Sequence, residues 1–150
     1  MAVQRDFPYA QFNFLVDLGT GTTEGPHAGF QECSPIGMTV ELFEYRNGND
    51  RINSVRKLPG LVRVGDVTLK RGIIGSLDLY HWLDETRNGD PGAVRNVVIQ
   101  LQSEDRAAVV QTWKLLRTRV VKHVSGPFNA RSTDVAVEEL TLACERLELE

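Results

Sequence analysis

The side chains most often used as metal ligands or nucleophiles are few in this chain, and their spacing favours neither use. His27, His81 and His123 have no histidine four residues away, and none of them belongs to an HExxH sequence. Cys33 and Cys144 lie far apart, outside any CxxC pair and without a local nucleophile signature. We expect both to be reduced and packed as small apolar side chains. These patterns predict no catalytic residue, no metal site and no bound cofactor.

A glycine-rich segment after the first strand pattern has the composition of a phosphate-binding loop. Residues 19–26 read GTGTTEGP, but no helix pattern opens behind them. A phosphate loop needs the amide groups of a helix N-terminus behind its glycines. We therefore interpret residues 19–26 as an exposed turn. The adjacent residues Asp84 and Glu85 are typical of the solvated face of a helix, not of a catalytic pair.

One basic cluster lies in the last third of the chain and consists of Arg117, Arg119 and Lys122. In a regular strand, Arg117 and Arg119 would share one face while Lys122 would lie on the other. Such a cluster could bind phosphate, but we favour pairing with carboxylates within the subunit or across an interface. The candidate partners are Glu138, Glu139 and Glu145. Exposed ion pairs add roughly 0–1 kcal/mol each, but they help to set the register of an assembly.

Length and composition indicate one globular domain over residues 1–150. The chain is 41% hydrophobic and 25% charged, and its 20 acidic residues exceed its 17 basic residues. This acidic balance disfavours nucleic-acid binding, which usually requires a basic excess. No apolar stretch approaches the roughly 18 residues of a membrane span. The N-terminal sequence MAVQRDFPYAQF lacks the apolar region of a signal peptide, so we expect synthesis in the cytoplasm without one.

Apolar residues recur with a period of two over most of the chain, which predicts β-strands. The expected strands cover residues 11–18, 30–36, 38–42, 62–70, 97–101, 107–124 and 135–144. The apolar phase shifts at Gly65 and Asp66 and again at Glu138 and Glu139, so we expect a bulge or bend at each place. The strand over residues 107–124 is longer than usual, and long strands on a small domain leave edges that need a partner.

A single helix is expected at about residues 76–88. Ser76 is its candidate N-cap, and Asn88 followed by Gly89 ends it. Its buried stripe consists of Leu79, Trp82, Leu83 and Thr86. Together the patterns predict a mainly β (α+β) fold, an antiparallel β-barrel or sandwich of about seven strands flanked by one α-helix.

The most polar stretch of the chain is about residues 46–56. It is too long for a tight hairpin and too polar for a core, so we expect a long protruding loop. The sequence KLPGL follows at residues 57–61. We interpret it as a turn, because proline fixes φ and glycine permits a left-handed residue.

The order of these motifs resembles the tail-tube protein family of contractile phage tails and contractile injection systems. The resemblance extends over nearly the whole chain, and no single segment carries it. The segments are DFPYAQFNFLVDL (6–18), EYR (44–46), KLPGL (57–61), TLKRG (68–72), LDLYHWL (77–83), SGPFNA (125–130) and DVAVEELTLA (134–143). The chain departs from the family in the turn at residues 19–26, which is longer and richer in Gly and Thr than the family's usual short turn.

The resemblance implies a structural protein, not an enzyme, that forms hexameric rings stacked into a hollow tube. Implied partners are further copies of the chain, a sheath protein, baseplate or tube-initiator proteins, and a cargo effector or DNA in the lumen. The tube would belong to a phage tail or a phage-tail-like particle, which can be released outside the cell. The implied ring-stacking residues are Arg46, Asn47, Asn49, Asp50, Arg51, Ile52, Asn53 and Arg56. The residues implied in packing between subunits are Phe7, Tyr9, Leu58, Pro59 and Leu61.

Other roles stay open. A tube-initiating or baseplate-proximal ring of the same machine would carry the same motifs. A small ligand- or flavin-binding β-barrel would need a cluster of Arg, Ser and Thr at strand ends, which the sequence does not present. A carbohydrate-binding sandwich would need a row of exposed aromatic side chains, and most of the 11 Phe, Trp and Tyr residues fall on expected core faces. For a tube, we expect a polar or acidic lumen to which a polyanion does not adhere.

Overall fold

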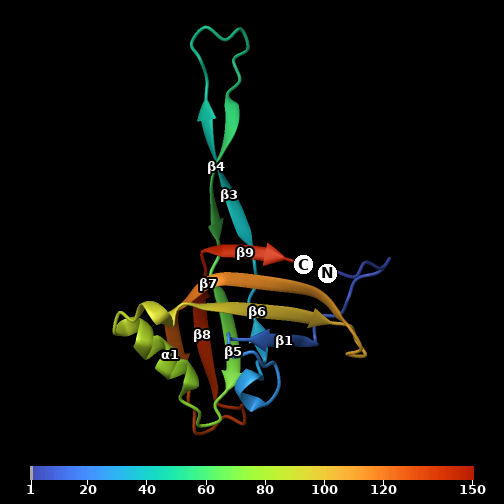
Figure 1. Ribbon diagram of the computed structural model, residues 1–150, viewed down its shortest axis with the longest axis vertical. Helices are drawn as coiled ribbons and strands as arrows, with labels where there is room; N and C mark the ends of the chain where they lie inside the picture. The colour runs from blue at the N-terminus through green and yellow to red at the C-terminus, as the bar shows by residue number, and fades with distance from the viewer. Residues whose placement is uncertain (1) are drawn as a thin grey trace.

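The computed structural model describes residues 2–150, which form mostly antiparallel strands (Figure 1). The strands are β1 (Phe14–Asp17), β2 (Glu32–Cys33), β3 (Met38–Tyr45), β4 (Arg56–Val64), β5 (Val67–Gly72), β6 (Arg95–Gln102), β7 (Val109–Ser125), β8 (Val137–Ala143) and β9 (Arg146–Leu149). Over the same residues there is one α-helix, α1 (Asp78–Arg87), and two short 3-10 helices, η1 (Pro26–Ala28) and η2 (Pro91–Ala93). The prediction of a mainly β fold with one helix is confirmed.

The long strand β7 joins two halves of a single sheet. The sheet has seven strands in the order β1-β6-β7-β8-β5-β2, with β9 on β7 beside this path. The first half of β7 pairs with β6 and β9, and its second half pairs with β8. In Figure 1, β1, β6 and β9 run across the view while β5 and β8 run down it. The corner coincides with Arg117, whose φ of 54° is left-handed, as expected where a strand passes between two packed sheets.

The sheet is open, which corrects the expectation of a possible closed barrel. In the described part of the chain, β1 pairs with β6 and β2 pairs with β5, and these strands end the path without meeting each other. The seven antiparallel strands and the long strand of 17 residues agree with the prediction. The ends of the sheet therefore retain backbone groups that another chain could pair with.

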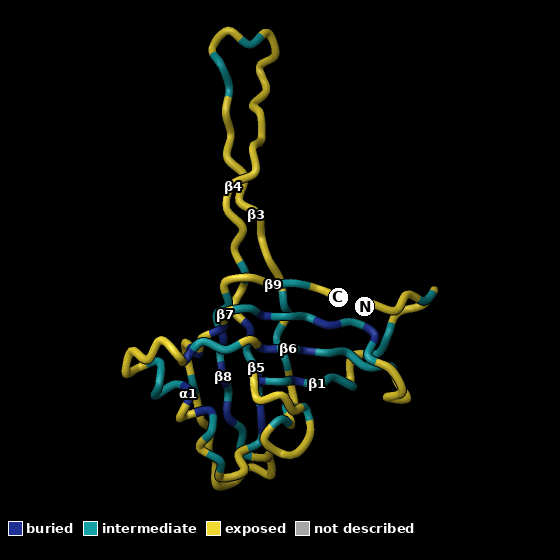
Figure 2. Tube along the Cα trace, viewed as in Figure 1, coloured by how far each residue is buried: buried dark blue, intermediate teal, exposed yellow. Residues whose placement is uncertain are grey.

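The core lies between the two halves of the sheet and beneath α1, where Figure 2 places nearly all of the buried residues. The sheet contributes Val67 and Leu69 from β5, Val97 and Ile99 from β6, Leu115 and Val120 from β7, and Leu140 and Leu142 from β8. The helix contributes Leu79 and Trp82, as its periodicity predicts. The indole nitrogen of Trp82 donates to the carbonyl of Ala93 at 2.6 Å, so its polar atom is satisfied inside the core.

Several predicted boundaries change. The helix begins at Asp78, and Leu77 occupies the N-cap position without a side-chain bond, so the prediction of Ser76 as the N-cap is wrong. The Ser76 hydroxyl instead donates to the Asp78 carboxylate at 2.9 Å. The strand expected at residues 11–18 shortens to β1, and the one at 30–36 shortens to β2. The break at residues 65–66 is confirmed, because β4 ends before it and β5 begins after it.

Glu138 does not lie at a bulge, which corrects a second expectation. β8 pairs with β5 without interruption, and Arg71 lies opposite Glu138. Glu138 continues the inward series of Leu140 and Leu142, and only 6% of its surface is exposed. The register shift lies in β7 instead, near Val120. A carboxylate can occupy this core position because the guanidinium of Arg71 lies beside it.

Arg71 is the centre of a buried ionic cluster and is only 1% exposed. It donates to Glu138 at 2.9 and 2.6 Å, to Asp78 at 3.0 and 2.7 Å, and to the carbonyl of His27 at 2.9 Å. The second oxygen of Glu138 lies 3.1 Å from Nε2 of His123. Burial by itself would raise the pKa of Asp78, but hydrogen bonds from Arg71 and a serine hydroxyl outweigh it and hold that pKa well below its ordinary value. The cluster thus ties β5, β7, β8 and the start of α1 together.

Candidate assembly interface

A two-stranded arm projects from the sheet (Figure 1) and consists of β3, β4 and the loop at residues 46–55 between them. Every residue of β3 is exposed, and so is every residue of β4 except Val64. Figure 2 shows the arm as exposed along nearly its whole length. An isolated two-stranded hairpin is at best marginally stable in water. The arm therefore lacks a supporting surface in the part of the chain that the structure describes.

The arm carries an unusual density of exposed apolar side chains. They are Met38, Val40, Leu42, Phe43, Tyr45, Leu58, Leu61 and Val62, each between 39% and 72% exposed. Near the root, Val40 pairs with Val62 on one face of the ribbon, and nearer the tip Phe43 pairs with Leu58 on the other face. Figure 1 shows the two strands crossing between root and tip, so the ribbon turns over. Both faces of the ribbon therefore carry exposed apolar side chains.

Residues 57–61 form part of β4 and not a turn, which corrects the interpretation of KLPGL. Pro59 lies opposite Leu42, and the register shifts next to this pair. A Cβ on Gly60 would lie 3.0 Å from the carbonyl oxygen of Glu41, so the close approach of the strands requires glycine there. The Pro-Gly pair thus makes a bulge, which a ribbon with two free edges can accommodate.

The loop at the tip is folded around the guanidinium of Arg46. Arg46 donates to the carbonyls of Ile52 at 3.2 Å and Asp50 at 3.0 Å, and to the side-chain oxygen of Asn53 at 3.2 Å. The backbone amide of Asn47 donates to the Asp50 carboxylate at 3.0 Å. These four residues of the predicted stacking set therefore have bonds within their own loop, and they fix its shape.

The remaining members of the predicted stacking set point outward. They are Asn49, Arg51, Ile52 and Arg56. Ile52 is 72% exposed although its carbonyl accepts from the loop's arginine. The side chain of Arg56 is 65% exposed and lies 3.9 Å from the Asp50 carboxylate. The tip consequently presents the apolar side chains of Ile52 and Val55 among cationic and amide groups.

The predicted packing residues fall into two separate places. Leu58, Pro59 and Leu61 lie on the arm, whereas Phe7 and Tyr9 lie in the N-terminal segment (Figure 1). The rings of Phe7 and Tyr9 lie 4.1 and 3.7 Å from the guanidinium of Arg5, which donates to the Glu104 carboxylate at 2.6 Å. This salt bridge holds the N-terminal segment against the turn between β6 and β7. Phe7 is still 65% exposed and free for a further contact.

The predicted basic cluster is divided by the bend in β7. Arg117 pairs with Glu145 at 2.7 Å, one of the expected partners. Glu138 is instead engaged by Arg71 inside the core, and Glu139 lies 3.4 Å from Lys70. The predicted alternation along β7 fails because the register shifts before Lys122.

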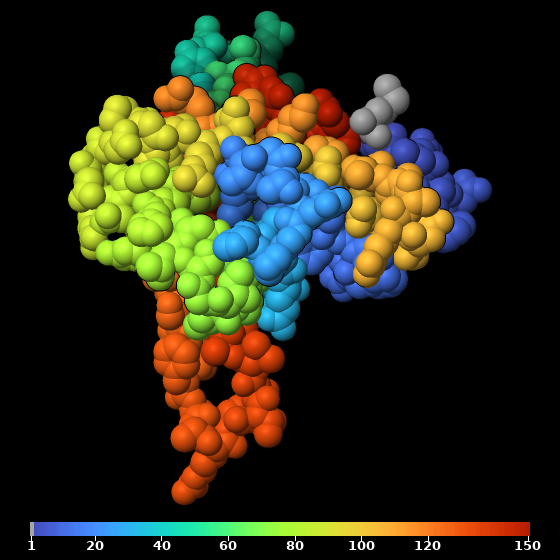
Figure 3. All heavy atoms as spheres, turned by 60° about the horizontal axis from the view of Figure 1, so that its bottom comes forward, coloured from blue at the N-terminus to red at the C-terminus, as the bar shows by residue number. Residues whose placement is uncertain are grey.

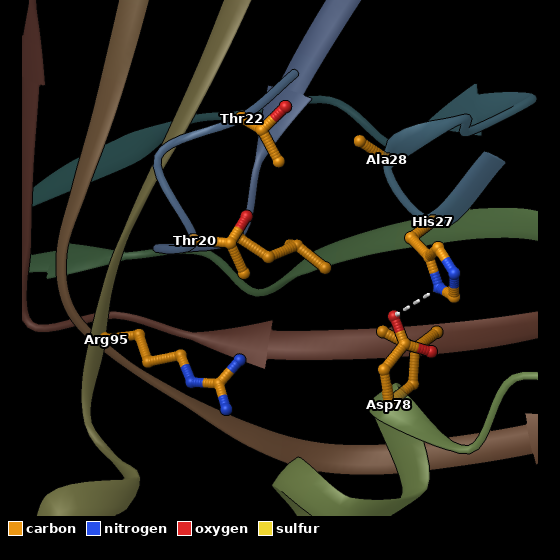
Figure 4. A pocket seen from close by; sticks show the side chains of 8 residues that line it. Thr20, Thr22, His27, Ala28, Asp78 and Arg95 are labelled. Carbon is orange, nitrogen blue, oxygen red and sulfur yellow. Dashed lines mark ion pairs between the residues drawn. The ribbon is translucent and has the colours of Figure 1, made fainter. Parts of the chain in front are cut away.

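One small pocket lies between α1 and the loop after β1 (Figure 4). Its volume is about 70 Å³, and its lining includes Thr20, His27, Asp78 and Arg95. The imidazole of His27 lies 3.8 Å from the Asp78 carboxylate, which is already bound by the ionic cluster. Sites for drug-sized ligands or cofactors usually measure about 300–1,000 Å³. The pocket does not fit a flavin or a nucleotide.

A wider, open groove of about 440 Å³ runs beside β1 at the end of the sheet. Its lining includes Phe12, Phe14, Phe30 and Arg106. Phe12 is 66% exposed. The groove therefore combines a free strand edge with exposed aromatic surface, as expected at a contact between chains and not at a cofactor site.

Comparison with known proteins agrees with the exposed arm and the free edge of the sheet. A model of the family described as "T4-like virus tail tube protein gp19" matches residues 10–148. The chain belongs to this tail tube family. It is thus a structural subunit of a tube, and its exposed arm and open sheet are features of an assembling protein. No curated protein is significantly similar to it. Within residues 2–150, no helix is long and apolar enough to cross a membrane.

Solved structures share the fold over almost the whole chain. A chain of the sheath–tube complex of the extracellular contractile injection system PVC, in its extended state, has a TM-score of 0.82 and 24% identity, with 97% of this chain and 93% of that chain covered. A chain of the tube-terminating cap of the anti-feeding prophage has a TM-score of 0.80 and 23% identity, with 100% of this chain and 95% of that chain covered. A chain of the 6-fold symmetrised anti-feeding prophage baseplate has a TM-score of 0.78 and 25% identity, with 97% of each chain covered.

Sequence reasoning missed the exposed apolar surface of the arm. A strand was expected at residues 38–42, but its exposure was not: Met38, Val40 and Leu42 are all exposed. The signal available in the sequence is that apolar residues continue on the opposite face at Phe43 and Tyr45. A strand that is apolar on both faces beside a polar loop indicates a surface to be covered by another chain.

Proposed function

We propose that this tube subunit forms hexameric rings, that the rings stack into a hollow tube, and that residues 1–150 act as one tail-tube domain. The observation that carries the proposal is the combination of an open sheet with an arm that none of residues 2–150 covers. Further copies can extend the sheet at its free edges around a ring. The arm then reaches out of the ring to a second one. Arg46, Asn47, Asp50 and Asn53 shape its tip, and the outward residues make the contact.

The partners follow from the same proposal. A sheath protein surrounds the tube, baseplate or tube-initiator proteins lie at its end, and a cargo effector or DNA passes through its lumen. The similarity to chains of a sheath–tube complex and of a 6-fold symmetrised baseplate supports these partners and the hexameric ring. The tube works mechanically inside a phage tail or phage-tail-like particle, and no step of it requires catalysis by this chain.

Electron microscopy of the purified chain tests the proposal directly. Negative-stain images over a range of concentrations should show rings with six-fold symmetry, or hollow rods of uniform bore. Analytical ultracentrifugation of the same samples should give a species of six chains before larger assemblies appear. A protein that stays monomeric at high concentration would contradict the proposal.

A second role, as a ring at the end of the tube, is favoured by a specific observation. The fold matches chains of a tube-terminating cap and a baseplate about as well as a chain of a sheath–tube complex. Labelling the chain with an affinity tag in intact particles would decide between the two roles. Label along the whole tube indicates the main subunit, and label at one end indicates a terminal ring.

A further inference from the structure

The body of the molecule exposes a second apolar surface, at the end opposite the arm. It consists of Ile73, Ile74, Leu77, Phe128 and Val135, which are 39%, 48%, 60%, 73% and 76% exposed, and we call it the end surface. These residues belong to two loops, the one between β5 and α1 and the one between β7 and β8. Figure 1 places these loops at the bottom of the long axis and the arm at its top.

The two loops of the end surface are held together by the backbone. The amide of Ile73 donates to the carbonyl of Ala136 at 2.9 Å and so joins the two loops, while the amide of Gly126 donates to the carbonyl of Val137 at 3.0 Å and closes the second loop on itself. Figure 3 turns this end forward and shows the loop at residues 126–136 projecting next to the segment at residues 73–77. The apolar side chains therefore lie on loops that backbone hydrogen bonds hold in place.

The arm and the rest of the chain carry charges of opposite sign. The arm, residues 38–64, holds five basic residues and three acidic ones. The chain has 17 basic and 20 acidic residues in all, so the remainder holds 12 basic and 17 acidic ones. The exposed cations at the arm tip are Arg51, Arg56 and Lys57. At the end surface Asp134 is exposed and Asp78 is 38% exposed, with Arg131 as the one neighbouring cation of that loop.

We propose that the end surface receives the arm of a second copy of this chain. The inference rests on the proposed stacking function and names the receiving site. Exposed apolar side chains of the arm would cover Ile73, Leu77, Phe128 and Val135, while its cationic tip lies near the acidic body. The two surfaces are different and lie at opposite ends of the molecule. Each copy can therefore bind one neighbour through its arm and bind the arm of a second neighbour through its end surface. Such a head-to-tail contact does not close on itself, so it extends along an axis.

A double substitution in the end surface tests the inference. Phe128→Ser with Val135→Ser should leave rings intact but abolish their stacking, so that micrographs show single rings where the unmodified chain gives rods. Val3→Ser, another exposed apolar residue at 48% exposure, is the matched control and should leave the rods unchanged. Circular dichroism checks that each variant is folded. Rods of normal length from the double variant would overturn the inference but leave the proposed function standing, whereas an unmodified chain without rings or rods would overturn both.

Cross-linking tests the same contact without relying on loss of assembly. In a background with Cys33 and Cys144 replaced by serine, Leu61→Cys together with Phe128→Cys should yield a ladder of covalent multimers on oxidation, since each copy has one donor and one acceptor. A mixture of the two single variants should yield dimers alone. The pair Leu61→Cys with Val3→Cys should not cross-link. A ladder from this control pair, or none from the first pair, would contradict the inference.

Discussion

The arm and the body are both antiparallel β-structure with apolar residues at regular spacing, yet one is exposed and the other is buried. In the body, Leu140 and Leu142 are fully buried because a second half-sheet and α1 cover them. In the arm, Val40 and Phe43 are about half exposed because the ribbon has no second layer. The difference teaches that a strand pattern reports which residues should be buried, but not which molecule buries them. For the arm, we propose that this molecule is another chain.

Charges separate the two regions in the same way. The body places Arg71 and Glu138 inside the core, where each is satisfied by several bonds. The arm keeps its ion pairs on the surface, as in the pair of Arg63 with Glu41 across the ribbon, whose side chains are 68% and 48% exposed. A surface pair contributes roughly 0–1 kcal/mol, while breaking a buried pair costs about 3–5 kcal/mol. Only the body, therefore, should depend on its charges for folding.

The largest effect is expected at Trp82, a residue of α1 that is fully buried in the core. Trp82→Ala removes its packing and the hydrogen bond to Ala93, so the free energy of unfolding should fall by about 3–5 kcal/mol. Urea denaturation followed by circular dichroism measures this free energy of unfolding, at concentrations where the chain is monomeric. A loss below about 1 kcal/mol would show that the core does not depend on the helix.

The buried ionic cluster should give the next largest effect. Glu138→Gln leaves Arg71 with Asp78 as its charged partner, so the free energy of unfolding should fall by about 2–4 kcal/mol. The matched control is Glu139→Gln on the same strand, whose carboxylate lies 3.4 Å from Lys70 and is 34% exposed. Its effect should stay within about 1 kcal/mol. Equal losses in the two variants, measured by the same denaturation curves, would contradict a special role for the cluster.

Substitutions on the arm should separate folding from assembly. Phe43→Ser and Leu61→Ser remove apolar groups that are 54% and 72% exposed, so the unfolding free energy of the monomer should change by less than about 0.5 kcal/mol. The same variants should fail to form rods by electron microscopy, because the covering contact is lost. If either variant destabilises the monomer as much as Trp82→Ala, the arm belongs to the core and the contrast between the regions fails.

The sequence predicted the body better than the arm, for a physical reason. Helix α1, strand β7 and the break before β5 follow from local periodicity and turn residues, and each was confirmed. The inward position of Glu138 could not be predicted, because its partner Arg71 lies 67 residues away in the chain. The Pro-Gly pair at residues 59–60 was misinterpreted as a turn, because cross-strand pairing with β3 overrides that local preference.

The candidate interface was predicted in part. The polar loop at residues 46–56 was expected to protrude, and the structure places it at the end of an arm. Its division into residues that shape the loop and residues that face outward depends on the bonds of Arg46, which no spacing rule reveals. The contributions of these residues to stacking, and of Phe7 and Tyr9 to subunit packing, stay predictions until assembly is measured.

The smallest effect is expected where the N-terminal segment meets the body, and it tests whether this segment behaves like the arm or like the core. Hydrogen bonds from Arg5 and from the amide of Ala10 lower the pKa of Glu104 from 4.5 to about 2. Because this pKa is depressed in the folded chain, the bridge is fully formed above the ordinary value and is lost as the pH falls towards the folded one. The protection of residues 3–10 against hydrogen exchange, taken relative to the intrinsic exchange rate at each pH, should therefore fall on acidification from about pH 5 to about pH 2, before the core opens. Glu104→Gln should show low protection at every pH in this range. Protection that stays constant with pH in the unmodified chain would mean that apolar contact, not the salt bridge, holds the segment in place.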